Sequence, residues 1–258
     1  MPFANNNGTN IYWRATGSGE PLLLIMGLGY PADMWHHVEG GLTEHFRVIV
    51  FDNRGIGKSI PASGPFLIPT MAADAVAVLD AAGADTAFVF GLSLGGYIAQ
   101  ELALTHPDRV RALVLGCTTC GGSHVVPARR EVLDVLLARA HMPPEQGIRA
   151  MIPYIYDSGT PADRIEEDMA VRLAYYPHPD TYLGQIAGVR VWQSCDRLGQ
   201  LSMPALILHG VNDQLIPPAN SGLLAKHIRR SEVQLIEHAS HVLSTDQPDS
   251  LIQRLTAF

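Results

Sequence analysis

Short apolar segments alternate along the chain with longer segments of helical spacing, and this alternation constrains the fold more than any other feature. The apolar segments have the length and composition of strands that are buried on both faces of a sheet. They lie at 22–26, 47–51, 87–90, 110–115, 205–208 and 233–236, and helical spacing is found at 71–82, 94–105, 219–227 and 243–258. This order predicts an α/β fold, in which helices cover both faces of a mostly parallel sheet.

The N-terminal segment differs from the rest of the alternation. Residues 10–14 alternate between polar and apolar side chains, and a Gly/Pro-rich turn follows at 17–21. A strand of this kind is half exposed, as in antiparallel pairs. We therefore expect an antiparallel strand pair at one edge of the sheet.

A long segment without strand signals interrupts the alternation at 123–200. Helical spacing dominates there, for example at 129–141 and 161–175. Because the strand and helix signals resume afterwards, this segment is expected to be a helical cap above one end of the sheet and not a separate domain. The core would then consist of residues 1–122 and 201–258.

Composition excludes several classes of protein. Hydrophobic residues make up 47% and charged residues 17% of the 258 residues, which supplies enough apolar material for one packed domain. The formal net charge is -7 and no Lys/Arg-rich run is present, so we expect no nucleic-acid partner. The N-terminus is polar, and the longest apolar run, 22–26, is too short to cross a membrane. These features predict a cytoplasmic protein without a membrane segment. The oligomeric state is left open.

The three cysteines do not form the pattern of a disulfide framework. They are Cys117, Cys120 and Cys195, an odd and small number that agrees with a reducing compartment. Cys117 and Cys120 have C-x-x-C spacing, which is compatible with a zinc half-site or a redox pair. Since no second Cys or His pair has matching spacing, we interpret the segment as an ordinary loop and expect no metal.

The segment Gly91-Leu-Ser93-Leu-Gly95 joins an apolar strand to a helix and has the G-x-S-x-G pattern of a nucleophilic serine. So sharp a turn closes only where the flanking positions lack side chains, as Gly91 and Gly95 do. It exposes the Ser93 hydroxyl above the carboxyl end of the sheet, at the positive end of the following helix. An ordinary Gly/Ser turn is the alternative. The flanking strand and helix favour the nucleophile.

A serine hydroxyl needs a base to take its proton, and the base needs a carboxylate to fix its tautomer. Asp213 lies in a polar loop after an apolar strand, on the same rim as Ser93, whereas the rival Asp196 lies inside the cap. His241 lies in the loop after the last strand, just before a helix, and His238 is nearer the strand and is expected to be structural. The chain order Ser, Asp, His favours this set.

With these residues assigned, the chain resembles the α/β-hydrolase superfamily over essentially its whole length, and within it the small carboxylesterases and 3-oxoadipate enol-lactonases. The segments that carry the resemblance are 26–29, 51–59, 91–95, 209–213 and 238–241. It implies the α/β-hydrolase fold, with an eight-stranded sheet, and a catalytic triad that needs no cofactor. It also implies an oxyanion hole formed by the backbone N–H groups of Leu28 and Leu94.

Some residues of these segments have a less direct expected role. Met26 stands where many relatives have His, which changes the polarity of the pocket and not the main-chain donor. Asp52, Arg54 and Ser59 match a segment that braces the loops behind the site in relatives. Arg54 as a substrate anchor is the alternative to that structural role.

Several aromatic residues are candidates for the substrate pocket. Trp35 follows the oxyanion turn, and the cap contributes Tyr156 and Trp192. Tyr154, Tyr175 and Tyr176 add to its aromatic content. A mostly apolar pocket uses such side chains, but each of them is equally compatible with core packing.

Together these features predict acyl transfer to water through an acyl-enzyme, with a small or medium hydrophobic ester or lactone as substrate. Two alternatives keep the same pocket: a cofactor-free perhydrolase (haloperoxidase), and a small-molecule receptor with vestigial hydrolysis. Ser at position 93 argues against the dehalogenase and epoxide-hydrolase branches, because their nucleophile is a carboxylate.

Overall fold

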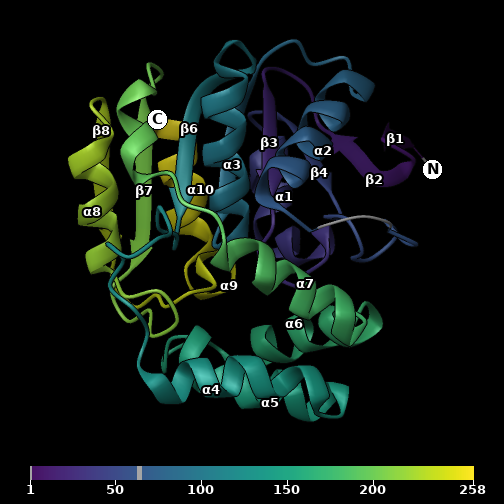
Figure 1. The fold of residues 1–258 in the computed structure, drawn as a ribbon, viewed down its shortest axis with the longest axis vertical. Coiled ribbons are helices and arrows are strands. Elements are labelled where there is room, and N and C mark those ends of the chain that lie inside the picture. Colours follow the sequence, from purple (N-terminus) through teal and green to yellow (C-terminus); the bar gives the residue numbers. More distant parts are fainter. Residues whose placement is uncertain (1, 63–65) are drawn as a thin grey trace.

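The computed structural model describes residues 2–62 and 66–258, and an eight-stranded sheet runs through the middle of this part of the chain (Figure 1). The strand order is β1-β2-β4-β3-β5-β6-β7-β8. The strands are β1 (Phe3–Asn6), β2 (Thr9–Thr16), β3 (Pro21–Ile25), β4 (Arg47–Phe51), β5 (Ala87–Leu92), β6 (Val110–Gly116), β7 (Ala205–Gly210) and β8 (Ser231–Ile236). β2 pairs antiparallel with β1 and β4, and the other neighbours are parallel. The predicted sheet and its antiparallel edge are confirmed.

Helices pack on both faces of this sheet because successive side chains of a strand point to opposite faces. In β3, for example, Leu23 and Ile25 belong to one apolar core, and Leu22 and Leu24 belong to the other. The first core is covered by α2 (Ile68–Ala81), α3 (Leu94–Thr105) and α8 (Ala219–His227), and the second by α1 (His36–Thr43), α9 (Leu243–Asp246) and α10 (Pro248–Ala257). Burial on both sides explains why the central strands are apolar throughout.

The segment predicted as a cap is helical in the structure. It contains α4 (Arg130–Ala138), α5 (Pro144–Ile155), α6 (Ala162–Ala174) and α7 (Pro179–Arg190). Figure 1 shows these helices as a layer beyond the lower edge of the sheet, where β6 gives way to the loop that leads into α4. The helical spacing at 129–141 and 161–175 predicts α4 and α6, whereas no comparable signal in the sequence marks α5 and α7.

The C-terminal helical segment differs from its prediction. A continuous helix was expected over 243–258, but the structure has α9 and α10, which are separated at Gln247. Gln247 has φ −136° and ψ 63°, and Pro248 follows it. Proline disfavours the helical conformation of the residue before it, which explains the break.

No helix among the described residues is long and apolar enough to cross a membrane.

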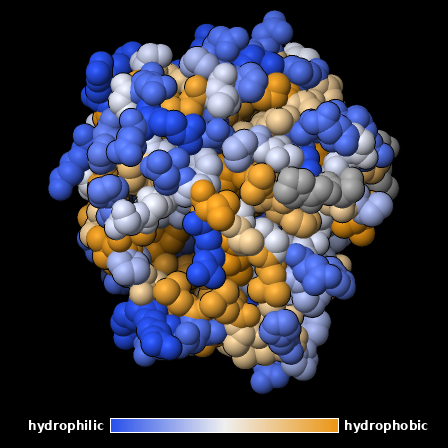
Figure 2. Space-filling view, in the orientation of Figure 1, coloured by the Kyte–Doolittle hydropathy of each residue, from blue (hydrophilic) through white to orange (hydrophobic). Residues whose placement is uncertain are grey.

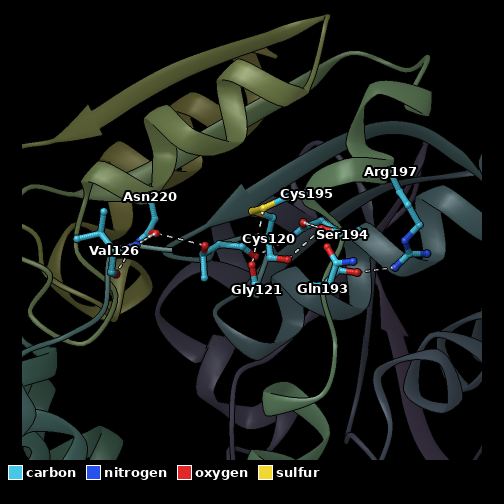
Figure 3. The surroundings of a disulfide bond; sticks show 10 residues. Cys120, Gly121, Val126, Gln193, Ser194, Cys195, Arg197 and Asn220 are labelled. Carbon is cyan, nitrogen blue, oxygen red and sulfur yellow. Dashed lines mark hydrogen bonds between the residues drawn. A yellow bond between two sulfur atoms is a disulfide. The ribbon is translucent and has the colours of Figure 1, made fainter. Parts of the chain in front are cut away.

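The structure corrects the expectation that the cysteines are unpaired. Cys120, after β6, forms a disulfide with Cys195, at the end of the cap segment, and their Cα atoms are 5.1 Å apart (Figure 3). The neighbouring Ser194 N–H donates to the Cys120 carbonyl at 2.8 Å. Cys117 is buried and free, so the C-x-x-C pair is not a redox pair. Counting along the sequence missed the bond because its partners are 75 residues apart.

This disulfide makes a prediction for thiol titration. Protein denatured without reductant should expose one reactive thiol, that of Cys117, and three after reduction, because two of the three cysteines are bonded to each other. Closing so long a loop should also contribute about 2–4 kcal/mol to the free energy of unfolding. Ellman titration of the wild-type protein measures the number of thiols. Urea denaturation of wild type and of the Cys120→Ser/Cys195→Ser variant measures the difference in the free energy of unfolding. Three thiols before reduction would contradict the bond.

Candidate active site

Ser93 occupies the sharp turn between β5 and α3, where the chain reverses direction. Its backbone has φ 56° and ψ −117°, a conformation that residues with a side chain rarely adopt. The Ser93 N–H donates to the Gly116 carbonyl, and the Thr118 hydroxyl donates to the Ser93 carbonyl, each at 2.8 Å. Contacts from the end of β6 therefore hold the strained turn in place.

The two glycines that flank Ser93 are required by close backbone contacts. A Cβ placed on Gly91 would overlap the carbonyl oxygen of Gly95. A Cβ on Gly95 would overlap the carbonyl oxygen of Ile25, at the end of β3. The sequence pattern thus reflects how tightly the start of α3 packs against the strands.

The three predicted side chains Ser93, Asp213 and His241 meet at the carboxyl edge of the sheet. Ser93 Oγ lies 2.9 Å from His241 Nε2, and His241 Nδ1 lies 2.8 Å from Asp213 Oδ2. His238, the alternative to His241 as the base, is exposed, and so is Asp196, the alternative to Asp213 as the carboxylate. With its proton on Nδ1, His241 presents a free lone pair to the Ser93 hydroxyl.

Asp213 is buried and hydrogen-bonded on both oxygens. Its Oδ1 accepts from the N–H groups of Leu215 and Ile216 at 2.9 Å, and its Oδ2 lies 3.3 Å from His209 Nε2. Burial by itself would raise the pKa of Asp213, but the charge of His241 and the hydrogen bonds from both histidines hold it below its usual range. Asp213 is therefore ionised when His241 takes up a proton. His209 begins the segment 209–213, but no pattern in the sequence assigns it this contact with Asp213.

The turn after β3 brings the second predicted donor beside Ser93. A Cβ on Gly27 would lie 3.3 Å from Ser93 Cβ, and both Leu28 and Leu94 line the same cavity as Ser93. Neither the Leu28 nor the Leu94 N–H donates to another group within the described residues. Both amides are thus available to an oxygen bound next to Ser93.

Two buried amide side chains that sequence reasoning missed hold this turn. Asn53 donates from Nδ2 to the Met26 carbonyl at 2.9 Å. Gln185, on cap helix α7, accepts from the Gly29 N–H at 3.0 Å through Oε1. Leu28 lies between these two contacts, so the core and the cap together set the direction of its N–H.

The segment 51–59 has the structural role that was expected. Arg54 forms a buried ion pair with Asp74, with its Nε 2.6 Å from Oδ2. Asp52 accepts from the Ala32 N–H at 2.7 Å, and Ser59 donates to the Asp52 carbonyl at 2.7 Å. Arg54 does not line the cavity, so its alternative role as a substrate anchor is wrong.

A cavity of about 560 Å³ lies in front of Ser93 and His241, between the cap and the core. Its cap side is mainly aliphatic, with Leu133, Leu136, Leu137, Met151, Ile155, Ile186 and Val189. In Figure 2 hydrophobic residues gather in the lower half of the molecule, where the cap meets the core. Such a cavity binds a ligand largely by excluding water from its apolar surface.

The three aromatic residues predicted for the pocket lie outside it. Trp35 is fully buried in the second core, with its ring centroid 5.2 Å from that of Phe90. Tyr156 donates to Asp168 at 2.8 Å, and Trp192 donates to Glu101 at 2.9 Å. The prediction is wrong because the polar tips of the two cap residues have buried partners elsewhere. The aromatic residues that do line the cavity are Tyr30 and Tyr97.

One buried group near the triad has side chains of the kinds that bind metals. Ligand atoms of Cys117, His209 and Asp213 lie within 4.8 Å of one another. Both Asp213 oxygens already have partners, and His209 Nε2 lies 2.7 Å from the Ile216 carbonyl oxygen. We therefore interpret the group as support for the Asp213 carboxylate.

Comparison with known proteins agrees with this geometry. The family model of the alpha/beta hydrolase fold matches residues 20–148. A protein of Azorhizobium caulinodans, whose name proposes it as the carbamate hydrolase RutD, is 32% identical over 100% of this chain and 98% of its own. A thermophilic esterase of Thermogutta terrifontis is 27% identical, with a TM-score of 0.85 over 100% of this chain and 96% of that one. Est816, described as an N-acyl homoserine lactone degrading enzyme, is 27% identical, with a TM-score of 0.81 over 100% of both chains. The chain belongs to the α/β-hydrolase family.

The glycine contacts at the Ser93 turn predict a large difference between two Gly→Ala variants. Gly95→Ala should lower the free energy of unfolding by about 2 kcal/mol or more, because the new methyl group overlaps the Ile25 carbonyl. Gly222→Ala is the matched control, since this exposed position in α8 has nothing within 4 Å of an added Cβ. It should raise the same quantity by up to about 1 kcal/mol. Equal urea midpoints for the two variants would contradict the packing at Gly95.

Proposed function

We propose that this protein is a serine hydrolase that cleaves a carboxylic ester or lactone through an acyl-enzyme. The observation that carries the proposal is the chain of hydrogen bonds from Ser93 through His241 to Asp213, which opens onto an apolar cavity. A buried carboxylate, an imidazole and a hydroxyl in this order form a nucleophile with its base. Membership of the α/β-hydrolase family supports the same chemistry.

In the proposed mechanism His241 first acts as a base and then as an acid. Its Nε2 takes the Ser93 proton as Oγ attacks the substrate carbonyl, and the Asp213 carboxylate stabilises the imidazolium that forms. The imidazolium then protonates the alkoxide oxygen as its bond to the carbonyl carbon breaks. The alcohol departs from an ester, whereas in a lactone it stays attached to the acyl group. In the second half, His241 deprotonates a water molecule that attacks the acyl carbonyl. The imidazolium then returns a proton to Ser93 Oγ as the bond between the acyl group and Oγ breaks and the acid is released.

The oxyanion of each tetrahedral intermediate is assigned to the N–H groups of Leu28 and Leu94. Each such donor contributes about 3 kcal/mol of transition-state stabilisation. The contacts of Asn53 and Gln185 to the 26–29 turn orient the Leu28 N–H before the reaction, so no donor has to reorganise during it. Gln185 is a positioning residue in this scheme.

The cavity supports a small or medium hydrophobic substrate, since its walls are mainly aliphatic and its volume is about 560 Å³. The relatives span ester and lactone cleavage, and the relative named for carbamate hydrolysis adds carbamates as a second substrate class. Esters, lactones and carbamates would all react through an acyl or carbamoyl group on Ser93. A panel of 4-nitrophenyl esters, lactones and 4-nitrophenyl carbamates of matched length separates them.

The other expectations from the sequence stay predictions. Perhydrolysis requires hydrogen peroxide to compete with water for the acyl-enzyme, which a product assay detects. A receptor would show ligand-dependent thermal stabilisation with very slow turnover. Cytoplasmic location also stays a prediction, and the Cys120–Cys195 disulfide counts against it, because reducing compartments keep thiols free.

Replacing the nucleophile should abolish hydrolysis. We expect Ser93→Ala to lower kcat/KM for 4-nitrophenyl butyrate by at least about 10,000-fold, because Ser93 has the only hydroxyl among the described residues that is hydrogen-bonded to His241 Nε2. Labelling with a fluorophosphonate probe should be lost in the same variant. Comparable activity in Ser93→Ala and wild type would remove Ser93 from the mechanism.

The buried carboxylate should matter for the rate and not only for stability. We expect Asp213→Asn to lower kcat about 1,000- to 10,000-fold, because an amide neither fixes the His241 tautomer nor stabilises its cation. Asp196→Asn is the matched control: this exposed aspartate lies on the cap segment, and its variant should stay within about twofold of wild type. Steady-state kinetics with circular dichroism as a folding check measure the difference. A normal kcat for Asp213→Asn would exclude the proposed role.

A further inference from the structure

Two buried arginines of the cap lie against the ring of Tyr30. Arg139 is 3% exposed and Arg172 is 2% exposed. Their guanidinium carbons lie 6.0 Å and 4.6 Å from the centroid of the Tyr30 ring, and that of Arg139 lies 4.8 Å from the Tyr182 ring. Contacts with aromatic faces and with tyrosine hydroxyls offset part of the cost of burying a cation, but they bring no negative charge.

Neither arginine has a direct acidic partner among the described residues. Arg172 Nη1 donates to the Tyr156 hydroxyl at 3.4 Å, and that hydroxyl donates to Asp168, so Arg172 reaches a carboxylate only through Tyr156. Arg139 Nε and Arg172 Nε and Nη2 are buried without an acceptor in the same part of the chain. Asp168 is four residues before Arg172, but it accepts from His36, Tyr156 and Thr245 at 2.8, 2.8 and 2.6 Å. Buried cations are normally paired, so this unbalanced charge requires an explanation.

Arg139 forms part of the wall of the cavity at the proposed active site. Arg139 and Tyr30 both line this cavity, together with Ser93 and His241. Its described lining contains no Asp or Glu, and the one other arginine, Arg190, is exposed. The buried guanidinium is therefore the main polar feature of a wall that is otherwise mostly apolar.

We propose that Arg139 binds a carboxylate of the substrate, so that the ester or lactone cleaved at Ser93 carries an acid group at the end remote from the scissile bond. The inference rests on the proposed hydrolase function and narrows its substrate class. A guanidinium fork matches a carboxylate in shape and in charge, and such a pair is strong where water is excluded. Arg172 adds a second positive charge behind Tyr30 without lining the cavity.

A matched pair of substrates tests the assignment. 4-Nitrophenyl hydrogen adipate and its methyl ester have the same scissile bond and differ in the remote carboxylate. We expect wild type to favour the acid by about tenfold or more in kcat/KM, and Arg139→Gln to lower this preference about 10- to 100-fold. Arg139→Lys keeps the charge but not the forked shape of the guanidinium, so its preference for the acid should lie between those of wild type and Arg139→Gln. Arg130→Gln, which removes an exposed charge of α4 that does not line the cavity, should keep the wild-type preference.

Competition on the wild-type protein gives a second readout that does not depend on a variant folding. Hexanoate should inhibit hydrolysis of the neutral ester at least about tenfold more strongly than hexanamide, because only the acid pairs with the guanidinium. Equal inhibition, or an Arg139→Gln protein with an unchanged preference for the acid, would overturn the carboxylate site while the hydrolysis of neutral esters still stands. Loss of all ester turnover in wild type would instead overturn the proposed function itself.

Discussion

The strained backbone of Ser93 is the constraint on which the rest of the site depends. Its positive φ lifts the hydroxyl out of the strand-to-helix turn, and the close contacts of Gly91 and Gly95 leave no room for a side chain at either position. Such strain persists only where the surroundings enforce it. Here the parallel sheet does so, because it ends β3, β5 and β6 at one edge and lets their backbones brace the turn.

The cap completes this site in two ways. Gln185 holds the turn that carries Leu28, so one proposed oxyanion donor depends on a contact between the cap and the core. Arg139 supplies a buried charge to a cavity whose wall is otherwise largely aliphatic. The Cys120–Cys195 disulfide joins the end of the cap segment to the loop after β6, close to where the cap begins. The disulfide thus joins the two ends of the cap segment to each other beside the end of β6.

The sheet and the meeting of Ser93, Asp213 and His241 could be predicted from sequence because both follow from local patterns. Strands buried on both faces are apolar runs, and residues that follow parallel strands share one edge. The pocket could not be predicted in this way. Trp35, Tyr156 and Trp192 are as compatible with packing as with lining, and only three-dimensional contacts decide between the two. The disulfide and the Gln185 contact join residues 75 and 156 positions apart, which no local pattern reports.

The central claim is that Ser93 becomes acylated during turnover. Intact-protein mass spectrometry after rapid mixing with a 4-nitrophenyl ester, followed by acid quenching and peptide mapping, measures this directly. The mechanism predicts a mass increase of one acyl group on the peptide that contains Ser93, which forms and decays at rates compatible with kcat. Hydrolysis without such an adduct, or an adduct on another residue, would contradict the account.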